Sequence, residues 1–309
     1  KSIQRMGDRR MPVEAMARDP HEKGFEQIES RAGRRQVSQR IVQVDENNTT
    51  GTDFATLSGV LSGAVRFAAT APLRDVITCH CTQCRASSGH FWAATSVPLD
   101  RFQLTEARGL RWYRASDIAE RGFCDQCGST LFWRPDGEYR ISFSPAALDG
   151  PTGLKITHQW HREDAGDYYA PEGPPPPAAA DPPDQLTCAC LCRGVTFSLP
   201  GPAGDITACH CAQCRKLSGH FAASFDADEG ALDYASRISL TEYKTPGGGA
   251  RGFCAACGSS LWFRAADGSF SVEAGCVAGP TGGRLTGHIF VGDKGDYYDL
   301  NDGLPQSKD

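Results

Sequence analysis

The chain has 309 residues and a formal net charge of −5, with 22% charged and 40% hydrophobic residues. This length suffices for two domains that each bury a core. The acidic balance gives nucleic acid or an anionic membrane no attraction to the average surface, so we expect neither as a partner. No run of 18 apolar residues and no secretory leader is present, which favours a cytoplasmic protein.

Residues 1–52 are predicted to be a disordered polar tail. They contain basic pairs such as Arg9-Arg10 among acidic residues and almost no aromatic residues. So little apolar surface cannot offset the entropy lost on ordering. The weakly basic first forty residues could contact an acidic partner, but a solvated extension is the simpler interpretation.

Residues 53–170 form the first predicted domain, which we expect to be mainly β. Short apolar or alternating runs, such as Tyr139 to Phe143, are separated by Gly, Pro, Ser and Asp. Runs of this length between turn residues are typical of strands, and no stretch has the period of a long amphipathic helix.

A proline-rich linker, residues 171–185, follows the first domain. Because proline fixes φ and removes a donor, we expect an extended polyproline II spacer that separates two units.

Residues 186–305 repeat the first domain at a constant offset of 130. The matching segments are Cys79–Arg85 with Cys209–Arg215, Ser88–Phe91 with Ser218–Phe221, Arg121–Ser129 with Arg251–Ser259 and, after a one-residue slip, Gly166–Tyr169 with Gly295–Tyr298. The repeat indicates a tandem duplication in which both copies share one architecture.

The fourteen cysteines occur in C-x-C and C-x-x-C groups, which favours metal binding over a disulfide framework. A C-x-C pair on a strand places both side chains on one face. Cys190 and Cys192, combined with the C-x-x-C knuckle of Cys254 and Cys257, would supply the four sulfurs of a closed structural zinc site.

Cys209, Cys211 and Cys214, followed by a short polar turn, remain as a group of three. Three protein ligands leave one coordination position open, as in a catalytic zinc that admits water or substrate. Because a metal can hold a thiol as its thiolate, a thiol substrate is a natural fourth ligand. The first copy carries the equivalent trio, which consists of Cys79, Cys81 and Cys84.

The motifs of the second copy match a known family. They read C-L-C-x-G-V-x-F, C-H-C-x-x-C-R-x-x-S-G, G-F-C-x-x-C-G-S-x-L and a closing H-I-F-V-G-D-K-G-D-Y-Y-x-x-x-D-G-L-P. This combination resembles the glutathione-dependent formaldehyde-activating enzymes and the related domain of centromere protein V. The resemblance covers nearly all of residues 186–305 and, with gaps, residues 54–170.

The resemblance implies two tandem mainly β domains of the β-tent type. It implies a structural zinc on the four cysteines named above and a catalytic zinc on Cys209, Cys211 and Cys214. It also implies a carbon–sulfur lyase reaction run in reverse, in which glutathione adds to formaldehyde and gives S-hydroxymethylglutathione. The alternative is a non-catalytic zinc-stabilised binding module of the centromere protein V type.

The first copy departs from the pattern. The register places Val60 and Ser62 where the second copy has Cys190 and Cys192, so two candidate metal ligands, Cys124 and Cys127, lack their expected partners. Either the structural zinc is missing there or these two thiols share a metal with other ligands. We expect the second copy to hold the better site.

Several neighbouring residues have two interpretations. His80 and His210 could be fourth ligands, although strand alternation points them away, and His90 and His220 could be acid–base groups or structural. Arg85, Arg215 and Arg251 could bind the carboxylates of glutathione or balance thiolate charge. Cys188 could replace Cys192, and Cys276 is most simply a small buried hydrophobe. The aromatic residues in the strand-like runs are expected in the core. They are Phe91, Trp92, Phe132, Trp133, Trp262 and Phe263.

Overall fold

The computed structural model describes residues 55–309, which belong to one compact unit. The predicted tail, residues 1–52, lies outside the described residues. Within them, no helix is long and apolar enough to cross a membrane.

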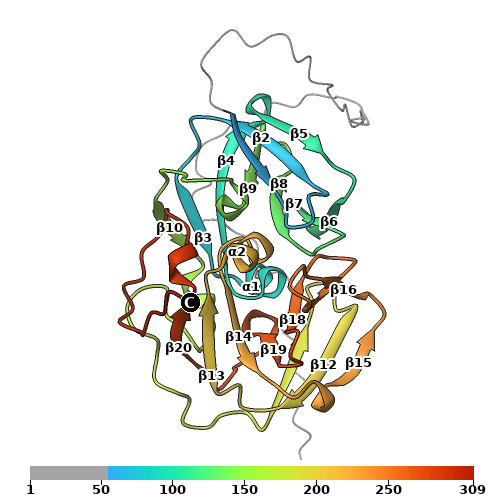
Figure 1. The fold of residues 1–309 in the computed structure, drawn as a ribbon, viewed down its shortest axis with the longest axis vertical. Coiled ribbons are helices and arrows are strands. Elements are labelled where there is room, and N and C mark those ends of the chain that lie inside the picture. Colours follow the sequence, from blue (N-terminus) through green and yellow to red (C-terminus); the bar gives the residue numbers. More distant parts are fainter. Residues whose placement is uncertain (1–54) are drawn as a thin grey trace, which may run out of the picture. The chain divides into compact units, whose positions relative to one another are not determined.

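Each copy contains a three-stranded sheet and a seven-stranded sheet, so the prediction of a mainly β chain is confirmed (Figure 1). In the first copy the small sheet has the order β1-β2-β5 and the large one β10-β3-β4-β9-β8-β7-β6. The strands are β1 (Ala55–Gly59), β2 (Arg66–Thr70), β3 (Val76–Cys79), β4 (Trp92–Pro98), β5 (Phe102–Glu106), β6 (Leu110–Ser116), β7 (Ala119–Cys124), β8 (Thr130–Pro135), β9 (Arg140–Phe143) and β10 (Ile156–Trp160).

The second copy repeats this order, with β11-β12-β15 as the small sheet and β16-β17-β18-β19-β14-β13-β20 as the large one. Only the pairs β3 with β10 and β13 with β20 are parallel among the described strands. The strands are β11 (Gln185–Ala189), β12 (Val195–Pro200), β13 (Asp205–Cys209), β14 (Ala222–Asp226), β15 (Asp233–Arg237), β16 (Leu240–Lys244), β17 (Ala250–Cys254), β18 (Ser260–Arg264), β19 (Phe270–Glu273) and β20 (Arg284–Ile289).

The strands follow their sequence patterns. In β12, Val195, Phe197 and Leu199 alternate with more exposed residues, as expected for a strand with one face in the core. All five residues of β17, which lies between β16 and β18 in the sheet, are buried. Gly252 in this strand leaves room for the Trp262 ring, since a Cβ there would lie 2.0 Å from the indole.

The segment after Cys211 is a short helix, so the expectation of a polar turn is wrong. Helix α2 (Ala212–Ser218) and its equivalent α1 (Thr82–Ser88) each end at a glycine with positive φ, Gly219 and Gly89. The helical turn carries Cys214 round to the side of Cys211, whose sulfur accepts a hydrogen bond from the Cys214 amide at 3.4 Å.

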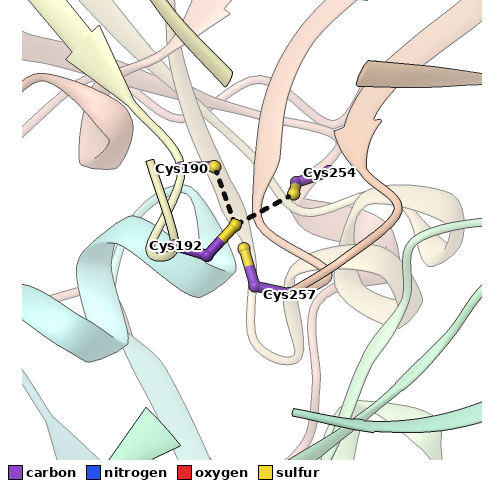
Figure 2. A group of neighbouring side chains, drawn as sticks. All are labelled: Cys190, Cys192, Cys254 and Cys257. Carbon is purple, nitrogen blue, oxygen red and sulfur yellow. Dashed lines mark hydrogen bonds between the residues drawn. The ribbon is translucent and has the colours of Figure 1, made fainter. Parts of the chain in front are cut away.

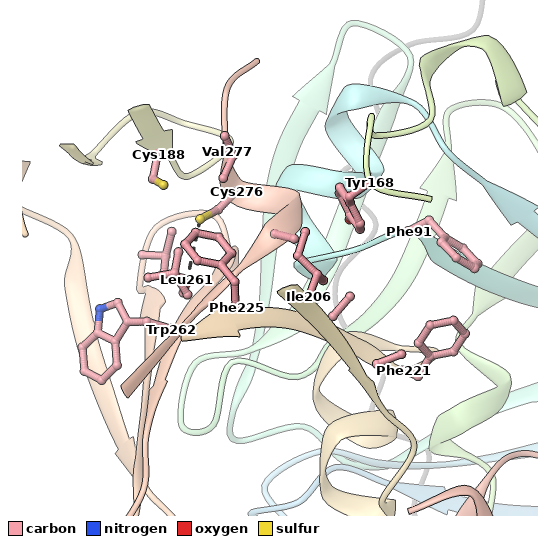
Figure 3. Packing of buried hydrophobic residues seen from close by; sticks show 14 of the residues in the cluster. Phe91, Tyr168, Cys188, Ile206, Phe221, Phe225, Leu261, Trp262, Cys276 and Val277 are labelled. Atoms are coloured by element: carbon pink, nitrogen blue, oxygen red, sulfur yellow. Dashed lines mark hydrogen bonds between the residues drawn. The ribbon is translucent and has the colours of Figure 1, made fainter. Parts of the chain in front are cut away.

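The linker does not hold the copies apart, and that expectation is also wrong. Phe91 and Tyr168 of the first copy belong to the same buried cluster as Phe221 and Ile206 of the second copy (Figure 3). The ring centroids of Phe91 and Phe221 are 5.4 Å apart. Apolar side chains of the two copies therefore share one core, and removing this surface from water favours their contact.

Reciprocal contacts join the two copies. Asp167 of the first copy accepts hydrogen bonds from the Thr281 and Gly282 amides, and Asp296 of the second accepts them from the Thr152 and Gly153 amides. The four distances lie between 2.7 and 2.9 Å. Such exchange of equivalent contacts is the pattern of a two-fold interface, here within one chain.

Short helical turns complete both copies. The 3-10 turn η6 (Ala274–Cys276) follows β19 and contacts α1, and the equivalent η3 (Pro145–Ala147) contacts α2. The other 3-10 turns are η2 (Leu99–Arg101), η4 (Arg162–Asp164), η5 (Glu229–Ala231) and η7 (Val291–Asp293).

Gly258 tests how strongly the copies depend on one another. Its φ is +77° and an added Cβ would lie 2.4 Å from the Phe123 ring of the first copy. We expect Gly258→Ala to lower the free energy of unfolding by about 3 kcal/mol, from backbone strain and overpacking together. Gly268→Ala is the matched control, because its φ is +89° with no atom within 4 Å, and it should cost only about 1 kcal/mol. Equal losses in urea unfolding would show that the inter-copy contact contributes nothing.

Candidate metal centres

Four cysteines of the second copy gather around one point (Figure 2). The sulfur of Cys192 lies 3.5 Å from that of Cys190 and 3.6 Å from that of Cys254, and all four sulfurs, including Cys257, lie within 4.8 Å of one another. Zinc–sulfur bonds of about 2.3 Å in a tetrahedron require sulfurs about 3.8 Å apart. The tetrad therefore fits a structural zinc both in donor type and in spacing.

Three cysteines of the tetrad lie in turns, and the fourth, Cys254, is the last residue of β17. Strand β11 ends at Ala189, so Cys190 and Cys192 lie in the turn that follows, contrary to the expectation that they share one strand face. The turn is held by the Val195 amide, which donates to the Cys190 sulfur at 3.2 Å, and by the Leu191 amide, which donates to the Ser259 hydroxyl. Cys188 lies apart from the tetrad, buried beside η6.

The first copy lacks a tetrad among the described residues. Cys124 and Cys127 are buried, and their polar neighbours are the hydroxyls of Ser62, 3.5 Å from the Cys124 sulfur, and Ser129, 3.2 Å from the Cys127 sulfur. Val60 is buried where the second copy has its first ligand. Among the described residues no group of four sulfurs forms here, so the closed donor set of the second copy's tetrad is not repeated in the first copy.

Both trios are intact. Cys79, Cys81 and Cys84 have sulfurs within 4.8 Å of one another, and so have their equivalents in the second copy. In each trio the first two cysteines are partly exposed and the third is buried. Three soft donors with one solvent-facing side fit a zinc that keeps a coordination position for a small molecule.

A buried arginine supports the third cysteine of each trio. Arg121 lies 3.2 Å from the Cys84 sulfur and Arg251 lies 3.2 Å from the Cys214 sulfur, each through Nη2. The neighbouring thiols and then the Arg121 charge lower the pKa of Cys84. Burial opposes the charge on Arg121, but the thiolates of the trio, led by Cys84, together outweigh burial and raise the pKa of the guanidinium. Each arginine thus stabilises thiolate charge.

The side walls of the trios differ. Trp92 pairs with Cys79 across β3 and β4, whereas Ala222 holds the same place opposite Cys209. In the second copy the Phe263 ring packs on the Arg251 guanidinium at 4.4 Å. Phe91, Phe132 and Trp262 are buried, as expected for core residues, and Trp133 packs partly buried beside Cys84 and Trp92.

Arg215 does not face its trio. It lines a cavity of about 230 Å³ with Lys294, Asp296 and Pro151, and it makes no hydrogen bond to the trio sulfurs within the part of the chain that the structure describes.

The four motif histidines hydrogen-bond to tyrosines. His90 and His220 bond Tyr168 and Tyr297 at 2.7 and 2.9 Å. Burial lowers the pKa of both histidines well below its usual value, so both are neutral at pH 7. His80 and His210 bond the other two tyrosines in the same way. Their partners are Tyr169 and Tyr298, at 2.9 and 2.7 Å.

A hydrogen-bonded chain extends from His210 in the second copy. His288 lies between the His210 ring, at 2.9 Å, and the Asp302 carboxylate, at 2.8 Å. In the first copy Gln159 replaces the second histidine and lies 3.1 Å from His80. Sequence reasoning did not identify this chain, because its members lie about 80 residues from the trio, although the repeated Gly-Asp-Tyr-Tyr segment offered a signal.

Sequence reasoning also missed Glu273, a buried carboxylate beside Arg251. Its Oε1 lies 3.7 Å from Nη1 of Arg251, and its Oε2 has no partner among the described residues. Burial raises the pKa of Glu273 to about 7, although Arg251 acts in the opposite direction. The first copy has Ser144 at this position, directly before η3.

The raised pKa of Glu273 predicts a pH-dependent loss of stability. Between its ordinary pKa of 4.5 and about 7 the folded state holds a proton that the unfolded state has lost, so stability falls as pH rises through this window. A shift of this size corresponds to roughly 3 kcal/mol. We expect Glu273→Gln to remove this loss, as measured by urea unfolding at pH 5 and pH 8. A wild-type slope that persists in the variant would contradict the assignment.

Two segments of the chain, residues 58–162 and 185–293, match the sequence model of one family, described as glutathione-dependent formaldehyde-activating enzyme. Together they cover more than half of the chain. The chain belongs to this family. The predicted resemblance and the presence of two tandem copies are thereby confirmed.

Further comparisons add little to the family assignment. No curated protein matches the chain. A crystal structure of a Rhodobacter sphaeroides protein from structural genomics is 22% identical, covers 30% of this chain and 88% of its own, and has a TM-score of 0.26. The formaldehyde-activating family is therefore the level at which the chain is identified.

Proposed function

We propose that the protein is a zinc-dependent carbon–sulfur lyase that adds glutathione, or a similar thiol, to formaldehyde or a related aldehyde. The observation that carries this proposal is the pair of open thiol trios, each solvent-facing on one side and each backed by a buried arginine. Membership of the family agrees with it.

The proposed reaction forms one carbon–sulfur bond and transfers one proton. The substrate sulfur forms a bond to the aldehyde carbon, the carbonyl π electrons move to oxygen, and the thiol proton ends on the new hydroxyl. A zinc held by a trio would supply a site where the substrate thiol is ionised near neutral pH. The three cysteines would hold the metal, and Arg121 or Arg251 would balance the negative charge that they gather.

The arginines therefore act on charge rather than on substrate shape. In both copies Nη2 of the arginine donates to the buried third sulfur. In the second copy Nη2 of Arg251 also donates to Oε1 of Gln213 at 3.3 Å. The partly exposed first two cysteines define the side from which thiol and aldehyde approach. His80 and His210, which lie between the first two cysteines in the sequence, are neutral and are held by hydrogen bonds to Tyr169 and Tyr298.

The test is the exchange between formaldehyde and glutathione, followed by NMR on the purified zinc-loaded chain. We expect acceleration over the uncatalysed exchange that persists when residues 1–52 are deleted. Absence of acceleration with zinc fully bound would reject the lyase and favour a non-catalytic zinc-stabilised binding module. Acceleration with another thiol or aldehyde alone would identify the substrate.

A further inference from the structure

The two trios differ in the charge around their arginines. Ser144 and Glu273 are equivalent, because after the one-residue slip between the copies each directly precedes a 3-10 turn, η3 in the first copy and η6 in the second. The Ser144 hydroxyl is buried and donates a hydrogen bond to the Gly219 carbonyl at 2.7 Å, whereas Glu273 is buried against Arg251. One copy therefore has a neutral hydroxyl where the other has a carboxylate.

Arg121 in the first copy is a buried cation with no carboxylate partner within residues 55–309. Its side chain belongs to a residue that is 6% exposed, and only Nη2 has a partner, the Cys84 sulfur. Its Nε and Nη1 have no hydrogen-bond partner among the described residues. Among the described residues, the trio thiolates and the Trp92 ring, whose centroid lies 5.8 Å from the guanidinium carbon, stabilise its charge.

Arg251 in the second copy is neutralised. Nη2 contacts the Cys214 sulfur, and Nη1 lies 3.7 Å from the Glu273 carboxylate, whose residue is 3% exposed. Arg85 and Arg215 occupy equivalent helix positions next to the two trios, so their charges cancel in the comparison. Within the part of the chain that the structure describes, the arginine at the second trio therefore has a carboxylate partner that the arginine at the first trio lacks.

We propose that Glu273 makes the two trios select thiols of different charge: the first trio prefers an anionic thiol, and the second accepts a neutral thiol nearly as well. This proposal rests on the proposed function only in taking the trios as thiol sites. This difference would give the duplication a function, because two copies with the same three cysteine ligands would bind different thiols.

The size of the effect follows from electrostatics. A unit charge about 7 Å from a bound carboxylate, at an effective dielectric constant near 20, changes its affinity by roughly one to two powers of ten before salt screening. At physiological salt we expect about a tenfold difference between the two trios.

The experiment measures thiol binding separately from catalysis. The full chain is loaded with Co²⁺, and the thiolate-to-cobalt absorption is followed while 3-mercaptopropionate or neutral 2-mercaptoethanol is added at pH 8.5, where Glu273 is ionised. Cys211→Ser leaves the first trio intact and Cys81→Ser leaves the second. We expect the affinity ratio of anionic over neutral thiol to be about tenfold larger for the first trio.

Glu273→Gln in the Cys81→Ser chain should raise the ratio of the second trio toward that of the first. The matched control is Glu229→Gln, an exposed carboxylate paired with Arg264 at 2.6 Å, which should leave the ratio unchanged. If the Glu273→Gln chain does not fold, the affinity ratios of the Cys211→Ser and Cys81→Ser chains, which both retain Glu273, still test the proposal.

Equal ratios at both trios, a ratio unaffected by Glu273→Gln, or no thiol-dependent absorption at either trio would overturn the proposal. Different ratios without any formaldehyde exchange would support it and reject only the lyase. Formaldehyde exchange together with equal affinity ratios at the two trios would support the lyase and reject only the difference in thiol selectivity.

Discussion

Replacing Cys254 by serine is expected to remove the most tightly held metal and to lower the free energy of unfolding by at least about 3 kcal/mol. Structural zinc contributes on the order of 10 kcal/mol to the folding free energy of small zinc modules. Loss of one of the four ligands removes a large part of this contribution. Cys254 joins β17 to the turn after β11, so the tetrad ties the start of the second copy to its middle.

Cys124→Ser is the matched control in the first copy. Cys124 is equally buried, but its polar neighbour is the Ser62 hydroxyl and no tetrad surrounds it among residues 55–309. We expect a loss of only about 1 kcal/mol, from the change of a buried sulfur to a hydroxyl. Metal content after dialysis against a chelator and thermal unfolding measure both effects.

The wild-type chain should retain one zinc after chelation that removes metal from the two open trios. The Cys254→Ser chain should retain none. Equal metal loss in the Cys124→Ser and Cys254→Ser chains would show that the tetrad is not the structural site.

Replacing Cys81 and Cys211 together should abolish formaldehyde–glutathione exchange, with a loss of at least about 10³-fold if the metal supplies the ionised thiol. Each cysteine is the middle member of a trio, and without it only two sulfurs remain to hold the metal. Each single variant should keep the share of the exchange carried by the other copy. NMR exchange spectroscopy measures all three.

Cys276→Ala controls for the loss of a thiol as such, because Cys276 is buried at the end of η6 and lies outside every candidate metal group among the described residues. It should keep the wild-type exchange rate. Full activity in the double variant would place the reaction elsewhere in the chain, and loss of activity in Cys276→Ala would point to a general effect on folding.

Much of the architecture was predictable because it depends on local patterns. Alternating runs such as Val195 to Leu199 predict strands, and the spacing of Cys209, Cys211 and Cys214 brings three thiols together whatever encloses them. The constant offset between copies predicts a shared topology. Helix α2 was missed because seven residues are too few to show a helical period.

Linker composition was a poor guide to the spacing of the copies. Pro174 to Pro177 predict a stiff local conformation, but composition contains no information on the faces that the connected units present. Only the folded chain shows that these faces are apolar and complementary, because there the rings of Phe91 and Phe221 pack against each other.

The sequence by itself determined that the chain holds two copies of a mainly β domain, with an open thiol trio in each and a complete tetrad only in the second. These features depend on residue identity at short, repeated spacings. Tertiary structure alone decided that the copies share a core, that Gly258 lies against Phe123, and that Glu273 neutralises one arginine of two. Such contacts join residues far apart in the chain or in different copies, and their energy depends on burial and distance, which no local pattern encodes.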